Sequence, residues 1–142
     1  MNHLGITGRR SSITENQYTS LKSLMRLWSE LTSNPVLHHG DCIGADEVSF
    51  LLGAEFGYKI ICHPPIGASL RAFTGIGNHE IREPREYLER NADIASECHA
   101  LIGIPDTFFE KLHSGTWATI RYARANNKLI IKIWPDGSVE IE

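Results

Sequence analysis

Residues 36–46 read VLHHGDCIGAD, and they indicate the type of fold because they join a strand to a helix through a turn that contains glycines. Residues 36–39 predict a short buried strand that stops at Gly40. A helix follows from about Gly44, because apolar residues then recur at helical spacing as far as Gly57, where a left-handed helix end is expected. A strand, turn and helix in this order predict a parallel sheet covered by helices.

The alternation of strand and helix continues along the chain. We expect strands at 3–7, 36–39, 58–62, 100–104 and 129–134, and helices between residues 14 and 34, 44 and 57, 86 and 97, and 114 and 125. Residues 138–142 could return as an antiparallel edge strand. Because crossovers between parallel strands are right-handed, the fold class is α/β: a three-layer Rossmann-like domain with a mostly parallel sheet of about five strands and that antiparallel C-terminal edge strand.

The chain is expected to form a single domain, residues 1–142, because no linker, internal repeat or low-complexity segment interrupts it. The longest irregular segment is 63–84, which contains glycines and prolines without a sustained period. Irregular segments of this length in compact domains are often active-site lids.

Composition excludes several classes of protein. Hydrophobic residues make up 42% of the chain, yet no apolar run is long enough to cross a membrane, and the N-terminus shows no secretory pattern. Cys42, Cys62 and Cys98 stand in dissimilar contexts, which fits free thiols in a reducing compartment. A cytoplasmic location without a membrane partner is therefore expected. The net charge of −3 supplies no overall basic surface, so duplex nucleic acid is not expected as a partner.

Ligands of such sheets bind beyond the carboxyl ends of the strands, where the strand order reverses. The turn at 40–46 is the strongest candidate there, because its glycines let backbone amides approach a phosphate at a helix N-terminus. A structural interpretation carries equal weight, in which Gly40 and Gly44 relieve a tight turn and Asp46 caps the helix. Ser114, Gly115 and Thr116 form a second candidate phosphate site, at the start of a later helix.

Arginines and carboxylates supply the remaining candidates. Arginine can clamp a phosphate with two parallel hydrogen bonds, and we favour Arg9 and Arg90 over the other arginines that follow the first strand or lie in the long loop. Asp41 and Asp46 could accept hydrogen bonds from ribose, or one of them could act as a general base or nucleophile in glycosidic cleavage. The histidines show no paired spacing typical of zinc sites, so no metal and no resident cofactor are expected, although His39 and His63 could line the pocket.

Taken in order, these motifs resemble the SLOG superfamily of Rossmann-like nucleotide-binding proteins, which includes the DprA, LOG ("Lonely guy") and YspA/YpsA-like groups. The resemblance spans nearly the whole chain and is greatest to the YspA/YpsA-like group. It depends on Gly-x-Thr-Gly-Arg at 5–9, on the turn at 39–46, on a proline after the third strand, on Arg90-Asn91 and on Ser-Gly-Thr at 114–116.

The resemblance implies a nucleotide, a nucleoside monophosphate or an ADP-ribose-like ligand, held by the first, second and fourth turns. The ligand-binding residues expected from the motifs and the resemblance are Thr7, Gly8, Arg9, Gly40, Asp41, Gly44, Ala45, Asp46, Arg90, Asn91, Ser114, Gly115 and Thr116. Related folds often dimerise, so a homo-oligomer is a candidate assembly.

Three functions follow from this interpretation. The leading one is a sensor or binding domain for a nucleotide-derived ligand. The alternative, implied by similarity to LOG proteins, is an N-glycosidase acting on a nucleoside monophosphate. LOG proteins carry a catalytic glutamate shortly after the late threonine, whereas no acid occurs between Thr116 and Ala125, so Asp41, Asp46 or Glu47 would have to supply the carboxylate. Similarity to DprA implies a third function, single-stranded nucleic-acid binding, which normally uses a positive groove with aromatic platforms.

Overall fold

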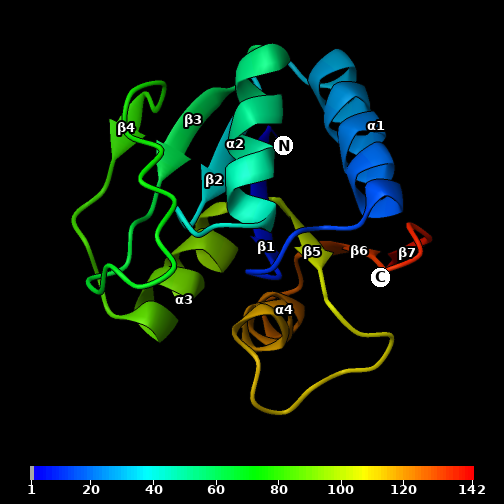
Figure 1. The fold of residues 1–142 in the computed structure, drawn as a ribbon. Helices are drawn as coiled ribbons and strands as arrows, with labels where there is room; N and C mark the ends of the chain where they lie inside the picture. Colours follow the sequence, from blue (N-terminus) through cyan, green and yellow to red (C-terminus); the bar gives the residue numbers. More distant parts are fainter. Residues whose placement is uncertain (1) are drawn as a thin grey trace.

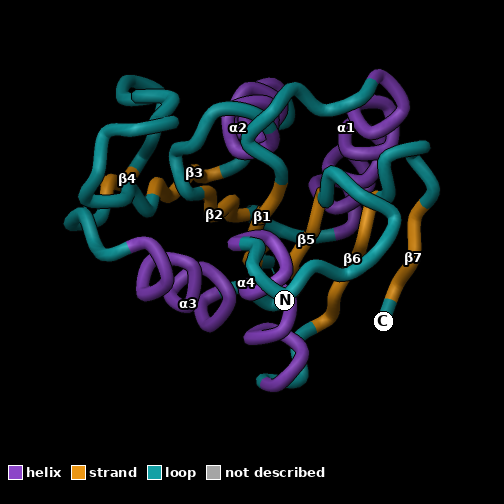
Figure 2. The backbone as a smooth tube through the Cα atoms, turned by 60° about the horizontal axis from the view of Figure 1, so that its bottom comes forward, coloured by secondary structure: helices purple, strands orange, loops and turns teal. Residues whose placement is uncertain are grey.

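Seven strands form one sheet in the computed structural model, which describes residues 2–142 (Figure 1). The strand order is β4-β3-β2-β1-β5-β6-β7, and every pairing is parallel except β6 with β7. The strands are β1 (His3–Gly8), β2 (Val36–His39), β3 (Lys59–Cys62), β4 (Glu80–Ile81), β5 (Ala100–Ile104), β6 (Leu129–Ile133) and β7 (Val139–Ile141). Figure 2 shows the strands side by side from β4 to β7.

Two helices cover each face of the sheet, which gives the three layers that the sequence predicted. The helices are α1 (Glu15–Leu31), α2 (Ala45–Glu55), α3 (Tyr87–Glu97) and α4 (Gly115–Ala125). α1 and α2 lie on one face and α3 and α4 on the other (Figure 1). Each face has its own apolar core, one around Leu21, Met25 and Leu37 and the other around Ile94, Trp117 and Ile120. None of the helices described between residues 2 and 142 is long and apolar enough to span a membrane.

Local signals in the sequence explain most element boundaries. Thr14 caps α1 and exchanges hydrogen bonds with Gln17, and the two residues form a capping box that fixes the start of the helix. The C-terminal segment returns as β7, antiparallel to β6, as expected for residues 138–142. The long segment after β3 contains β4, which the sequence analysis missed because this strand has only two residues and both are exposed.

The strand order reverses between β1 and β5. From β1 the chain moves outward to β2, β3 and β4, and it then crosses to β5 on the other side of β1 before continuing to β6. The carboxyl ends of β1 and β5 are joined beyond the sheet, because the Arg9 amide donates to the Ile104 carbonyl over 2.9 Å. This is the position where doubly wound sheets bind their ligands.

Candidate functional site

A cavity of about 360 Å³ lies at this reversal point. Four segments line it: the end of β1, the start of α3, the loop after β5 and the start of α4. Its lining residues are Gly8, Arg9, Arg10, Tyr87, Asp106, Lys111, His113, Ser114, Gly115 and Thr116. This volume is within the usual range of small-molecule sites.

The start of α4 gives the cavity its hydrogen-bond donors. Ser114 caps the helix, since its hydroxyl accepts from the Trp117 amide over 3.3 Å. Within residues 2–142 no hydrogen-bond acceptor engages the amides of Gly115 and Thr116. The first turn of α4 carries no acidic residue. The positive end of the helix dipole and two unengaged N–H groups therefore lie at the cavity wall, and this arrangement favours an anion.

Three cationic side chains line the same cavity, but they differ in their engagement. The Arg10 guanidinium lies 3.9 Å from the centre of the Tyr87 ring and has no hydrogen bond or ion pair within the described residues. Arg9 instead donates to Ser11 (3.0 Å) and to Gln17 (3.3 Å). Lys111 forms an ion pair with Asp106 at 3.0 Å. Arg10 is thus the cation most available to a ligand.

The start of α2, the strongest phosphate candidate in the sequence, has a different environment. Gly44 has φ +87°, and a Cβ there would lie 2.3 Å from the Arg9 carbonyl oxygen. The Ala45 amide donates to that same oxygen over 3.1 Å. Asp46 and Glu47 place acidic residues in the first turn. This turn packs against the chain leaving β1, so its geometry favours the structural interpretation of Gly44.

Asp41 holds the long loop after β3. Its carboxylate accepts hydrogen bonds from Arg71 (2.9 Å) and from both the amide (2.9 Å) and the hydroxyl (2.8 Å) of Thr74. Burial alone would raise the pKa of Asp41, but the hydrogen bonds from Thr74 and Arg71 outweigh it and hold the pKa below its ordinary value. The carboxylate does not line the cavity at the reversal point.

Asp46 and Arg90 are both buried, and neither lines this cavity. Asp46 accepts from the Cys42 amide over 3.2 Å. Burial raises the pKa of Asp46, and the charge of Arg90 opposes that shift. Arg90 donates to the carbonyls of Gly40 and His63 and to the Asn91 side chain. Arg90 therefore joins α3 to the ends of β2 and β3.

A smaller hollow of about 10 Å³ contains much of the remaining motif. This is about the space that one buried water occupies. The predicted site residues that line it are Thr7, Gly8, Gly40, Asp46, Arg90 and Asn91. The side-chain N–H₂ of Asn91 is buried with no hydrogen-bond partner in the described chain. Tyr87 lines both the hollow and the larger cavity.

The predicted site residues thus separate into groups. Gly8, Arg9 and the three residues of the late motif meet in the larger cavity, whereas Asp41, Gly44 and Ala45 lie outside both spaces. Five further residues line the larger cavity and were not among the expected ligand-binding residues, namely Arg10, Tyr87, Asp106, Lys111 and His113. Arg10 and Asp106 each follow a strand end by two residues, at the sheet edge where such folds bind their ligands. Nothing in the local pattern marks Tyr87.

Other candidates from the sequence have structural partners. Arg71 and Arg82 of the long loop, and Arg85 just after it, each pair with carboxylates. His39 bonds to Asn78 over 2.8 Å and His63 to His38 over 2.9 Å, and neither histidine lines the larger cavity. Burial lowers the pKa of His63 to about 3.

Three solved structures share the fold of this chain at low sequence identity. TM1055, a structural genomics target, has a TM-score of 0.68 and 14% identity, over 92% of this chain and 72% of its own. DNA processing protein A (DprA) from Streptococcus pneumoniae has a TM-score of 0.69 and 19% identity, over 92% of this chain and 49% of its own. DprA from Helicobacter pylori, described as binding single-stranded DNA, has a TM-score of 0.66 and 18% identity, over 92% and 64%.

This chain therefore spans about half to two thirds of the two DprA chains. No family model matches the sequence, and no curated protein is significantly similar to it. TM-scores of 0.66 to 0.69 show a shared fold, whereas identities of 14 to 19% do not identify a ligand. The motifs predicted a Rossmann-like α/β fold of the kind found in the SLOG superfamily, and the fold that this chain shares with DprA agrees with that predicted fold.

Proposed function

We propose that this protein binds a nucleotide or nucleotide-derived ligand by its phosphate, in the cavity beyond β1 and β5, as a binding or sensing domain. One observation carries the proposal: the unengaged amides of Gly115 and Thr116 and the guanidinium of Arg10 line the same cavity of about 360 Å³. Amides at a helix start and an arginine are the groups that proteins use to hold phosphate.

The rest of the cavity suits the organic part of such a ligand. With a phosphate against the start of α4, His113 remains to contact a sugar or a base, whereas the ring of Tyr87 already carries the Arg10 guanidinium. Asp106 can accept a hydrogen bond from a ribose hydroxyl, as acidic residues do in dinucleotide sites. Three cationic side chains and one carboxylate line the cavity, so the lining charge favours an anionic ligand.

Binding measurements on an Arg10→Gln variant test the proposal. Isothermal titration with AMP, ADP, ADP-ribose and inorganic phosphate is expected to find at least one ligand whose affinity falls about 10- to 100-fold in the variant, because a charge-assisted contact is lost. Arg26→Gln is the matched control, since it removes the same charge from an exposed residue of α1 outside the cavity. Absence of binding by every ligand, or equal affinity in both variants, would contradict the proposal.

N-glycosidic hydrolysis is a second candidate because one carboxylate lines the same cavity. That carboxylate belongs to Asp106, whereas Asp41 is engaged by Arg71 and Thr74, and Asp46 is buried and does not line the cavity. The binding proposal expects no free base when the protein is incubated with AMP. Chromatographic detection of adenine, abolished by Asp106→Asn, would instead support the enzyme.

Single-stranded nucleic acid is a third candidate on the strength of one surface feature. Phe108 and Phe109, in the loop after β5, are 61% and 65% exposed and lie close in sequence to the cavity-lining Lys111. Exposed aromatic rings next to cations can stack on bases. Competition between a short oligothymidylate and the bound mononucleotide, lost in a Phe108→Ala and Phe109→Ala double variant, would favour this function.

A further inference from the structure

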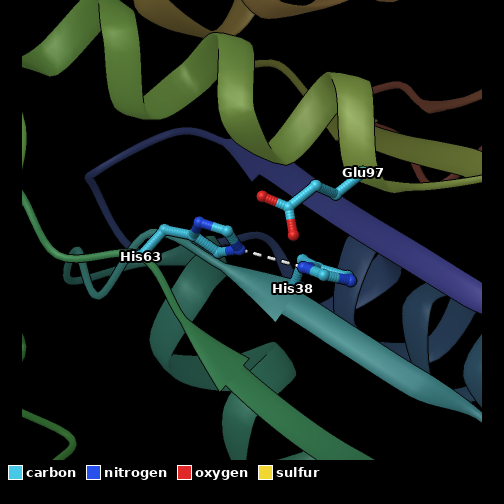
Figure 3. A group of neighbouring side chains, drawn as sticks. All are labelled: His38, His63 and Glu97. Atoms are coloured by element: carbon cyan, nitrogen blue, oxygen red, sulfur yellow. Dashed lines mark hydrogen bonds between the residues drawn. The ribbon is translucent and has the colours of Figure 1, made fainter. Parts of the chain in front are cut away.

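Three potential metal ligands meet on the α3 face of the sheet, outside the proposed ligand cavity. His38 lies on β2, His63 directly follows β3, and Glu97 is the last residue of α3. Figure 3 shows the Glu97 carboxylate directed from the helix toward the two imidazoles. One ligand atom from each residue lies within 4.8 Å of the other two.

The two imidazoles face each other through nitrogen atoms. His38 Nδ1 and His63 Nε2 are 2.9 Å apart, and the other ring nitrogen of His38 is 2.8 Å from His3 Nδ1. A hydrogen bond between two neutral imidazoles needs one proton between their nitrogens. A metal ion can take the place of that proton, because it accepts a lone pair from each nitrogen at about 2.0 to 2.1 Å.

We propose that His38 Nδ1, His63 Nε2 and a carboxylate oxygen of Glu97 bind one divalent transition-metal ion, with Zn²⁺ as the ion that fits this ligand set. Two histidines and one glutamate are an established zinc set in which water supplies the fourth ligand. Both imidazoles are buried, but the Glu97 side chain is 32% exposed, so water can reach the open position from that side.

Outer hydrogen bonds orient the ligands as they do in known metal sites. The ring nitrogen of His38 that faces away from the proposed ion contacts His3, which fixes the imidazole plane. Arg82 donates to both Glu97 oxygens, at 3.0 and 2.8 Å, and each oxygen keeps a further lone pair for a metal. Glu80 lies 3.1 Å from Arg82 and offsets its positive charge beside the site.

In a second group of potential metal ligands, the nitrogen and oxygen atoms are already hydrogen-bonded to other residues. His39, Asp41 and Cys62 also lie within 4.8 Å of one another. However, the ring nitrogens of His39 contact Asn78 and the Asp41 amide, and the Asp41 oxygens are held by Arg71 and Thr74. Residues of the long loop therefore already use the ligand atoms of His39 and Asp41 as hydrogen-bond partners. The side chains of His38 and His63, in contrast, form hydrogen bonds only to other histidines.

Cobalt titration of untagged, EDTA-treated protein tests the proposal, because Co²⁺ in a four-coordinate histidine site absorbs visible light. We expect one Co²⁺ per chain, displacement by Zn²⁺, and a rise of several degrees in the melting temperature with Zn²⁺, since an ion that binds only the folded chain stabilises it. Glu97→Gln is expected to weaken binding at least tenfold.

Glu80→Gln is the matched control, because Glu80 also pairs with Arg82 but is not one of the three ligands. It is expected to bind Co²⁺ as the unmodified protein does. His63→Gln is expected to abolish the visible band, with circular dichroism in EDTA confirming that the variant is folded. No saturable band in the unmodified protein, or equal affinity in the Glu97 and Glu80 variants, would overturn the proposal.

Discussion

Two helix starts in this protein follow glycine-containing or serine-glycine turns, and their surroundings differ. At α2 the chain itself takes the place of a ligand, because the Arg9 carbonyl contacts Gly44 and accepts from the Ala45 amide. At α4 the amides of Gly115 and Thr116 border an open cavity. Acidic residues occupy the first turn of α2, whereas the first turn of α4 has none.

A glycine before a helix therefore predicts that another group approaches the backbone closely, but it does not specify which group. A neighbouring segment and a phosphate both demand a residue without a side chain. The charges of the first turn separate the two cases, since acidic residues there repel an anion. Mutations at the two starts should therefore affect different measured quantities, namely stability at α2 and ligand affinity at α4.

The largest effect is expected from Gly44→Ala. A Cβ at this position would overlap the Arg9 carbonyl oxygen in a backbone conformation that alanine disfavours, so the free energy of unfolding should fall by about 3 kcal/mol or more. Gly57→Ala is the matched control, because Gly57 also has positive φ but has no atom within 4 Å of the added Cβ, and about 1 kcal/mol is expected. Urea denaturation measures both, and equal losses would remove the close-packing argument.

An intermediate effect is expected from Asp41→Asn, and it should depend on pH. The folded-state pKa of Asp41 is lowered, so its stabilisation is fully present above the unfolded value of 3.8 and is lost as the pH falls through the folded pKa. The variant should be about 1 to 2 kcal/mol less stable than the parent at pH 7, and this gap should close in acid below the folded pKa.

Urea denaturation at pH 7, 5 and 3 measures the dependence. The exposed ion pair of Asp106 with Lys111 offers a control, since Asp106→Asn should change stability by less than about 0.5 kcal/mol at pH 7. A gap for Asp41→Asn that stays constant in acid would show that its carboxylate charge does not anchor the long loop.

The smallest effect is expected at α4, from Thr116→Val. The substitution keeps the side-chain shape and removes the hydroxyl of a residue that lines the cavity, so affinity for the phosphate ligand should fall about fivefold while stability stays nearly unchanged. Isothermal titration measures the affinity. Thr119→Val serves as the comparison, because its hydroxyl is taken up by the Gly115 carbonyl within the helix. A loss of affinity in Thr119→Val as large as in Thr116→Val would argue against a direct contact from Thr116.

The sequence predicted the layers and most strands because apolar runs and capping signals are local. It missed β4, which is a strand only because its backbone pairs with β3 at Ile61 and Cys62. Two exposed residues are too few to show the alternation of apolar and polar residues that predicts a strand, so this strand could not be predicted from the sequence.

The candidate site was predictable in its location but less so in its members. The late serine-glycine-threonine motif lies in the cavity as placed by the sequence. Arg9 was favoured over Arg10, but the side chain of Arg9 turns toward Gln17 of α1, a contact that depends on how α1 packs. The proposed metal ligands come from three separate segments, so their spacing along the chain resembles no zinc motif.

The turn between β2 and α2 also has a consequence for how the protein folds. In this turn Asp41 accepts a hydrogen bond from Arg71, which lies 30 residues further along the chain. The Gly40 carbonyl accepts one from Arg90, which lies 50 residues further along. Contacts between such distant segments require large loops to close before they form, which slows their appearance during folding. The pairing of β1 with β5 closes a still longer stretch of chain, from Leu4 to Ala100, so we expect this turn and the centre of the sheet both to form late in folding.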